Sequence, residues 1–375
     1  MVKNKKNYEE NLKLNNIFKK IDNEIKNSKN ILVYFDTDAD GLTSYIQLKK
    51  YYNNIDNNKI ITGIPYYDKD SDKKPFFDSL VNVNKYDLII FLDRPTVEEE
   101  YFVENKKIIW IDHHPSNDKK LIKKYNILHF NPLDYNFSYY PVTYWVYKLT
   151  KGFNKDIGLI GTISDFFLID EIIDGSNILN LEEINNMRKN MTDEEILRDL
   201  TYNSFLDKFI TLYNFVFKLK EEEIYKSIKW LEKLNYEDLK IEFDINKNEL
   251  INKINKNLEK VNKIIKRALK EKDEKIFYFE YSGKTSFTSI IANKLGYYLK
   301  NWKILIICFM NNRENKAYFS IRSQKDYIIN KIVSKISKKY GGRGGGHPNA
   351  SGANIDLNIK DDFVIELKNE FSKII

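Results

Sequence analysis

Short apolar runs alternate with amphipathic stretches over the first part of the chain. Apolar runs predict strands at 31–35, 60–65, 88–92, 108–111 and 127–130. Periodic apolar positions predict helices at 8–28, 42–51, 141–150 and 155–163. Apolar strands that alternate with helices are typical of a parallel sheet covered on both faces, so we expect an α/β domain over residues 1–175.

The pattern changes twice further along the chain. Residues 176–272 contain no Gly or Pro and are rich in Leu, Ile, Lys and Glu, which predicts a helical connector. Strands are expected again at 276–280, 304–310 and 317–322, and helices at 286–300 and 325–339. The sequence therefore predicts a second, smaller α/β domain over residues 273–375.

Composition excludes several classes of protein. The chain has no run of about 20 apolar residues, which a membrane span requires, and its Lys- and Asn-rich N-terminus lacks the apolar core of a secretory signal. The single cysteine, Cys308, excludes an internal disulfide and a cysteine-based zinc site. A net charge of +7 favours anionic partners. We expect a cytoplasmic protein without membrane contact.

Acidic residues and histidines gather where the predicted elements end. They are Asp36, Asp38 and Asp40 after the first strand, Asp93 after 88–92, Asp112, His113 and His114 after 108–111, and Asp165 after the helix at 155–163. Ligands bind beyond the carboxyl ends of parallel strands. We therefore expect these side chains to meet at one edge of the sheet.

Such a cluster predicts a site for divalent metal ions. Several carboxylates in one place repel each other unless a cation neutralises them. Carboxylates combined with imidazole suit Mn²⁺ well and Mg²⁺ less well. Two ions about 3.5–4 Å apart would clamp both oxygens of a displacement at phosphorus. Taken singly, residues 36–41 also fit a helix-capping turn, and Asp93 fits a turn residue.

A glycine-rich segment lies near the C-terminus. Residues 341–352 read Gly-Gly-Arg-Gly-Gly-Gly-His-Pro-Asn-Ala-Ser-Gly. A glycine-rich turn exposes backbone N–H groups to an anion, and Arg343 and His347 would add donors and positive charge. We therefore expect this segment to bind phosphate, with a flexible linker as the alternative.

The acidic motifs and the glycine-rich segment, in this order along the chain, resemble the motifs of the DHH phosphoesterase superfamily. Residues 36–41 are similar to its first motif, Asp93 to the second, Asp112-His113-His114 to the third, and residues 161–165 to the fourth. Residues 344–352 are similar to the signature of the C-terminal substrate-binding domain called DHHA1. The resemblance extends over most of the chain and leaves only the helical connector without a motif.

The resemblance implies a cleft between two α/β domains and two metal ions, usually Mn²⁺ with Mg²⁺ as a substitute, bound by the first domain. One ion would take Asp38, Asp93 and Asp165, and the other Asp40, Asp93 and His113. His114 would contact the scissile phosphate or assist proton transfer, and Asp112 would orient the histidines. The second domain would hold a substrate phosphate through Arg322, Arg343, Gly344, Gly345, Gly346, His347 and Asn349.

One position departs from the family pattern. Many members have a histidine ligand two or four residues before the position of Asp38, where this chain has Asp36 and Tyr34. Asp36 is similar to the aspartate of RecJ-type exonucleases, so we count it among the metal ligands, with Tyr34 as the alternative. The change alters the ligand set of the first ion and its preference among divalent metals.

The resemblance leaves three functions open. The first is an exonuclease that hydrolyses single-stranded DNA or RNA with a metal-bound hydroxide, in a layout similar to compact archaeal RecJ-like proteins. The second is an enzyme for short oligonucleotides, nucleotide bisphosphates or cyclic dinucleotides. The third is a non-catalytic scaffold in a replication complex, which the intact acids and histidines argue against. We expect the first, and a partner in replication or repair by analogy alone.

Overall fold

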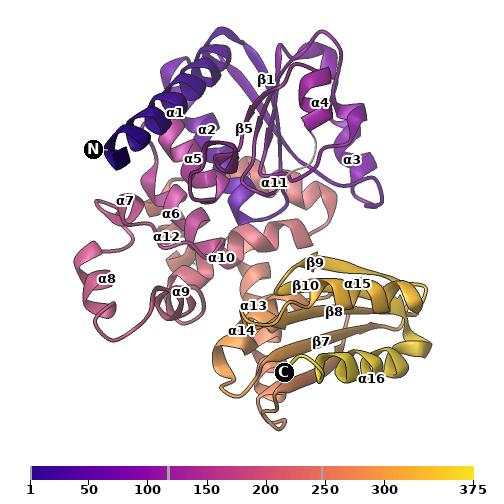
Figure 1. Ribbon diagram of the computed structural model, residues 1–375. Helices are drawn as coiled ribbons and strands as arrows, with labels where there is room; N and C mark the ends of the chain where they lie inside the picture. The colour runs from indigo at the N-terminus through magenta and orange to yellow at the C-terminus, as the bar shows by residue number, and fades with distance from the viewer. Residues whose placement is uncertain (1, 116–118, 246–247) are drawn as a thin grey trace. The chain divides into compact units, whose positions relative to one another are not determined.

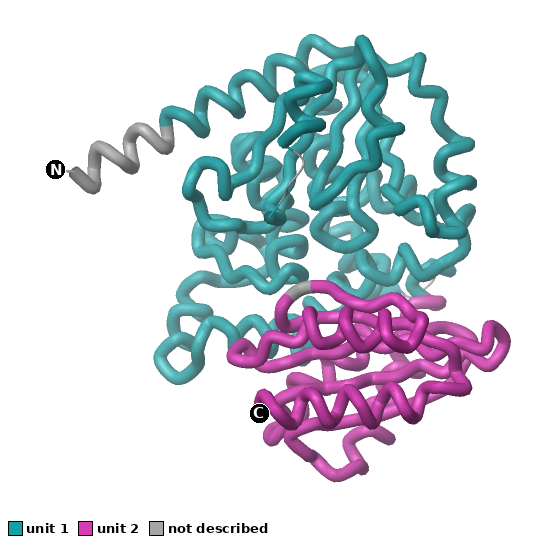
Figure 2. The backbone as a smooth tube through the Cα atoms, turned by 45° about the vertical axis from the view of Figure 1, so that its right-hand side comes forward, with its two compact units in different colours: residues 1–251 teal, residues 252–375 magenta. Residues whose placement is uncertain are grey.

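The computed structural model describes residues 2–115, 119–245 and 248–375. The chain divides into two compact units, residues 1–251 and residues 252–375 (Figure 2). Over the described residues, none of the helices combines the length and the apolar character that crossing a membrane requires.

A parallel sheet forms the centre of the first unit. Its strands are β1 Asn30–Phe35, β2 Ile60–Pro65, β3 Leu88–Leu92, β4 Lys107–Ile111 and β5 Leu128–Phe130. They lie side by side in the order β2-β1-β3-β4-β5, and neighbouring strands run parallel. Each predicted strand is confirmed to within one residue at either end. Every residue of β3 is buried, which explains its continuous apolar sequence.

Helices cover the sheet of the first unit, with α2 and α5 on one side and α3 and α4 on the other (Figure 1). The helical elements are α1 Val2–Asn27, α2 Ala39–Ile55, α3 Lys74–Ser79, η1 Val83–Lys85, η2 Glu99–Tyr101, α4 Lys119–Lys124, η3 Pro132–Tyr135, α5 Val142–Leu149 and α6 Lys155–Ser164. A Cβ at Gly161 of α6 would lie 2.2 Å from Oγ1 of Thr43 on α2. Glycine at this position therefore lets the two helices approach closely.

The region without a motif is helical, as predicted. Its elements are α7 Asp170–Ile173, α8 Leu181–Met187, α9 Asp193–Tyr202, α10 Leu206–Phe215, η4 Val216–Lys218, α11 Glu221–Leu231, α12 Tyr236–Ile245 and α13 Glu249–Ala268. Just after α11, Glu232 accepts hydrogen bonds from Tyr45 Oη and Lys49 Nζ of α2, each at 2.6 Å. Helices α7 to α12 belong to the first unit, and Glu232 joins the end of α11 to α2.

The second unit is the smaller α/β domain that the sequence predicts. Its elements are β6 Ile276–Ser282, α14 Thr288–Tyr298, β7 Ile304–Asn311, β8 Lys316–Ser323, α15 Asn330–Lys339, β9 Arg343–His347, β10 Ala350–Asp356, η5 Leu357–Ile359 and α16 Lys360–Phe371. The strand order is β6-β7-β8-β10-β9; β6 and β7 are parallel and the other pairs antiparallel. One face, including Cys308, forms a core with α15 and α16.

Residues 343–347 of the glycine-rich segment form a strand, whereas residues 341–342 and 348–349 form turns or bends, so the prediction of a turn is only partly right and the alternative of a flexible linker is wrong here. Residues Arg343–His347 form β9, which lies at the end of the strand order and pairs with β10. A Cβ at Gly344 would lie 2.1 Å from Ser337 Oγ on α15, and one at Gly346 would lie 2.5 Å from the Ala350 carbonyl oxygen. These glycines are needed because neighbouring elements approach the strand closely.

Candidate metal centre

The carboxyl ends of three adjacent strands bring acidic residues to one edge of the first sheet. Asp36 follows β1, Asp93 follows β3 and Asp112 follows β4. Each residue still donates its backbone N–H to the next strand: Asp36 to Leu92, Asp93 to Ile111 and Asp112 to Phe130, at 3.0–3.2 Å. The sheet register therefore holds the three acids at the same level, as the strand pattern predicts.

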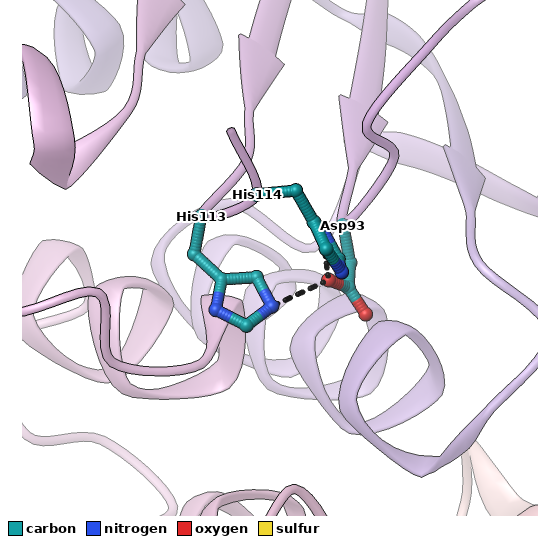
Figure 3. Close-up of side chains that lie close together, drawn as sticks. All are labelled: Asp93, His113 and His114. Atoms are coloured by element: carbon teal, nitrogen blue, oxygen red, sulfur yellow. Dashed lines mark ion pairs between the residues drawn. The ribbon is translucent and has the colours of Figure 1, made fainter. Parts of the chain in front are cut away.

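Asp93 lies at the centre of this edge. Its backbone is in the left-handed region, with φ of +61°, a conformation that aspartate tolerates better than most residues. The residue is 1 % exposed, and among the described residues its Oδ1 has no hydrogen-bond donor. Oδ1 lies 3.4 Å from Nε2 of His113 and 3.8 Å from Nδ1 of His114 (Figure 3). A buried carboxylate oxygen that lacks a donor fits a bound cation.

The first turn of α2 carries two further acids. Asp38 is the N-cap of α2 and accepts a hydrogen bond from the Gly41 N–H at 2.9 Å. Asp40 is buried, and its two oxygens accept bonds from the backbone N–H groups of Val142 and Thr143 at 2.8 and 2.7 Å. These N–H groups begin α5, whose N-terminus carries partial positive charge. The start of α5 therefore orients the Asp40 carboxylate.

The His113 ring is held by one nitrogen and turns the other toward two carboxylates. Its Nδ1 is 3.1 Å from the Tyr139 carbonyl oxygen, so the Nδ1–H group donates to that oxygen. The other nitrogen, Nε2, then keeps its lone pair and faces Asp93 and, at 3.8 Å, Asp165 at the end of α6. A histidine anchored by one nitrogen to a carbonyl group and offering the other among carboxylates is typical of metal sites.

His114 is held differently from His113. Its Nδ1 donates to Asp112 Oδ1 at 2.9 Å, and its backbone N–H donates to Asp112 Oδ2 at 3.1 Å. Asp112 is fully buried, and both of its oxygens accept hydrogen bonds from His114. Burial lowers the pKa of His114, but the hydrogen bond to Asp112 and nearby carboxylate charges raise it more, so the net pKa lies above the ordinary value. This environment favours a protonated imidazole.

The described residues form three groups whose ligand atoms lie within 4.8 Å of one another. The groups are Asp36, Asp38 and Asp93; Asp40, His113 and Asp165; and Asp93, His113 and His114. All six predicted ligands are thus brought together, and Asp93 occurs in two groups. Asp165 lies with Asp40 and His113, whereas the resemblance implies Asp38 and Asp93 as its partners. How the ligands divide between two ions stays a prediction.

The electrostatics of the cluster also fit a cation. Burial, followed by the charges of Asp36 and Asp40, raises the pKa of Asp38 to about 7. Burial is also the main cause that raises the pKa of Asp40, Asp93 and Asp165 above the ordinary carboxyl value. Without a cation, these groups resist ionisation, and a divalent ion would displace their protons.

Two residues at this site are missing from the sequence prediction. Arg94 donates from Nη1 to Asp36 Oδ1 at 2.8 Å; the sequence signal was a basic residue directly after the second-motif aspartate. Asn214 of α10 accepts a hydrogen bond at Oδ1 from the Ala39 N–H at 3.1 Å, at the start of α2. No sequence signal pointed to Asn214, because it lies in the helical region without a motif.

The residues predicted to bind substrate lie in the second unit. Arg322 Nε donates to Asn293 Oδ1 at 2.8 Å, and the Asn349 amide group donates to Ser323 Oγ and the Tyr327 carbonyl oxygen at 3.0 and 2.9 Å. The Asn349 amide nitrogen therefore stabilises the loop after β8. Arg343 is exposed on β9, which also contains Gly344, Gly345 and Gly346. The His347 side chain lies outside the described part of the structure.

Two family models match the two units. The model of the DHH family, N-terminal domain, matches residues 30–166, and the DHHA1 domain matches residues 273–373. Together they cover more than half of the chain. The chain belongs to the DHH/DHHA1 family. The acids and histidines of its first unit lie within or at the edge of the matched DHH region.

Solved structures share the fold of this DHH/DHHA1 protein. RecJ from Thermus thermophilus in complex with Mn²⁺ has a TM-score of 0.58 at 14 % identity, with 96 % of this chain and 55 % of that chain covered. The DHH domain of a protein described as a member of a family of ribosomal proteins has a TM-score of 0.65 at 15 % identity, with 98 % and 92 % covered. CDC45 from Entamoeba histolytica has a TM-score of 0.53 at 10 % identity, with 96 % and 99 % covered.

The DHH/DHHA1 protein thus spans about half the length of the RecJ chain that it resembles. At these identities, the likeness shows a common fold. Among curated proteins, no sequence matches significantly.

Asn214 allows a first test of the metal centre. The change Asn214→Leu removes the acceptor for the Ala39 N–H and should loosen the turn that carries Asp38 and Asp40. We expect Mn²⁺ affinity, measured by isothermal titration calorimetry, to fall about tenfold because misplaced ligands bind weakly. Asn203→Leu, at the end of α9, is the matched control. Unchanged affinity in Asn214→Leu would contradict a positioning role.

Proposed function

We propose that this protein is a Mn²⁺-dependent exonuclease that hydrolyses phosphodiester bonds of single-stranded nucleic acid, with Mg²⁺ as a weaker substitute. The observation that carries the proposal is the acid and histidine cluster around Asp93, whose buried Oδ1 lacks a hydrogen-bond donor among the described residues. Such a donor set suits two divalent ions, and these supply charge neutralisation and an activated water when bound.

The residues of the first unit have separate roles in this proposal. Asp38, Asp40, Asp93, His113 and Asp165 would hold the ions, because their ligand atoms lie close together and three of the residues, Asp40, Asp93 and His113, are buried. His114, kept in place by Asp112, would carry the proton for the leaving oxygen of the substrate. Its raised pKa suits a proton donor near neutral pH.

Three observations support a nucleic-acid strand as the substrate. The net charge of +7 favours a polyanion. The fold is shared with RecJ, which was solved with Mn²⁺ and also with Mg²⁺. The edge strand β9 adds exposed Arg343 and a row of glycines, through which backbone N–H groups can approach phosphate closely.

The deciding experiment measures Mn²⁺-dependent hydrolysis of end-labelled single strands, as DNA and as RNA, from dinucleotides to several tens of nucleotides. Stepwise shortening of the long strands would support the exonuclease, and the labelled end would give the polarity of cleavage. Cleavage of only the shortest substrates would instead assign an oligonucleotidase. If no substrate is cleaved in Mn²⁺ or Mg²⁺, the proposal is wrong and a non-catalytic role follows.

Arg343 tests the part of the second unit in substrate binding. Arg343→Ala should raise KM for long strands about tenfold, because one charge-assisted contact to phosphate is lost. The affinity for Mn²⁺, measured by calorimetry, should stay unchanged. Arg313→Ala, another exposed arginine of this unit, is the matched control. A weaker affinity for Mn²⁺ in Arg343→Ala, or an unchanged KM, would contradict the assignment.

A further inference from the structure

Arg94 is a buried cation next to the acid cluster. Its side chain is 10 % exposed, and its Nη1 and Nη2 atoms donate to Asp36 Oδ1 at 2.8 Å and to Asp68 Oδ1 at 2.6 Å. The guanidinium carbon lies 4.4 Å from the centroid of the Tyr66 ring, and the Arg94 carbonyl oxygen accepts a bond from Trp110 Nε1 at 2.9 Å. Arg94 is therefore fixed by four neighbours, which differs from a mobile surface arginine.

Asp36 receives two donors on a single oxygen. Its Oδ1 accepts bonds from the Thr37 N–H at 2.8 Å and from Arg94. One Asp36 oxygen also lies within 4.8 Å of ligand atoms of Asp38 and Asp93. Asp36 is thus shared between a permanent cation, Arg94, and the place where a metal ion would lie. Asp68 is at the other end of Arg94 and is 67 % exposed, so water screens its charge.

Arg94 adds a permanent positive charge to a region with many carboxylates. The five aspartates in the ligand groups would carry five negative charges when ionised, and two divalent ions supply four positive charges. Arg94 is a further positive charge beside this set, and it donates directly to Asp36. A carboxylate paired with a guanidinium group attracts a divalent ion less strongly than an unpaired carboxylate does.

We propose that Arg94 is a positioning residue that makes Asp36 an electrically neutral member of the metal centre. The inference rests on the proposed two-metal function. Arg94 fixes Oδ1 and cancels the charge of Asp36, so the first ion is bound less tightly than three charged carboxylates would bind it. The same ion pair stabilises the metal-free protein, because it removes one charge from a set of mutually repelling acids.

Four proteins test this inference by calorimetric titration with Mn²⁺ and by the electron paramagnetic resonance signal of free Mn²⁺. The Arg94→Met variant should bind the first ion, the one near Asp36, about tenfold more tightly than the wild type does, because Asp36 regains its full charge. Asp36→Asn should bind that ion about tenfold more weakly, because the site loses one carboxylate charge while the positive charge of Arg94 stays beside it. The double variant should return to within about threefold of the wild type, because both charges are gone.

Two further measurements separate charge from packing. Arg94→Lys keeps the positive charge and should bind Mn²⁺ like the wild type, while Asp68→Asn, the matched control at the exposed end, should also leave the affinity unchanged. Without metal, Arg94→Met should unfold at a lower temperature than the wild type, and circular dichroism confirms that each variant is folded.

The outcomes separate this inference from the proposed function. If the wild type binds two Mn²⁺ ions but both single variants bind more weakly, and the double variant is no better than Asp36→Asn, then Arg94 is only a packing residue and the inference is overturned. If the wild type binds no Mn²⁺, the proposed function fails together with this inference.

Discussion

Asp93→Asn should reduce turnover of a single strand by at least about 10³-fold, because a residue present in two ligand groups loses its charge. Asparagine tolerates the left-handed backbone at this position, so the variant should keep its fold. The measurement is kcat at saturating Mn²⁺, together with the number of bound ions from calorimetry.

The control for this variant is Asp134→Asn, which changes a half-exposed aspartate of the same unit outside the ligand groups. It should retain normal kcat and both ions. Near-normal turnover in Asp93→Asn would contradict the two-metal assignment. Loss of turnover with both ions still bound would show that Asp93 is needed for the reaction but is not a metal ligand.

We also expect the stabilisation of the folded protein by Mn²⁺ to depend on pH. The pKa of Asp38 is raised to about 7 in the folded protein, and that of Asp40, Asp93 and Asp165 is also raised, mainly by burial. A carboxyl group with a raised folded pKa favours the fold when protonated. The metal-free protein should therefore lose stability as pH rises through about 7. Mn²⁺ binds the ionised groups, so its stabilising effect should grow over the same range.

This prediction is checked by thermal unfolding in EDTA and in Mn²⁺ at a series of pH values on both sides of neutrality. The difference in Tm should increase with pH, and calorimetry in two buffers of different ionisation enthalpy should show that binding releases protons. Asp38→Asn should flatten the dependence near neutral pH. A difference in Tm that is constant or shrinks with rising pH would contradict the raised pKa values.

The sequence predicted those parts of the fold that depend on local pattern. Continuous apolar runs located all strands of the first sheet, because a strand buried on both faces needs apolar residues throughout. The rule that ligands lie beyond the carboxyl ends of parallel strands then placed Asp36, Asp93 and Asp112 together. The strand order was not predicted, because it depends on pairings between distant segments.

The parts that the sequence did not predict depend on contacts between distant residues. The hydrogen bonds from α5 to Asp40, and from Ala39 to Asn214, join segments that carry no common motif. The resemblance implied different roles for His113 and His114, but the sequence did not show which group holds each ring, the Tyr139 carbonyl oxygen for His113 and Asp112 for His114. The strand β9 was missed because glycine-rich sequences usually favour turns.

The bond between Ala39 and Asn214 also bears on how the protein is made. The two residues are 175 positions apart, so a ribosome adding about 5–20 residues per second completes Asn214 roughly 10–35 s after Ala39. Once residue 165 has been added, the nascent chain carries every DHH motif, yet the turn with Asp38 and Asp40 lacks its final anchor until Asn214 is made. Maturation of the metal centre is therefore tied to synthesis of α10, and a product of stalled translation that ends before α10 would contain the motifs without a completed site.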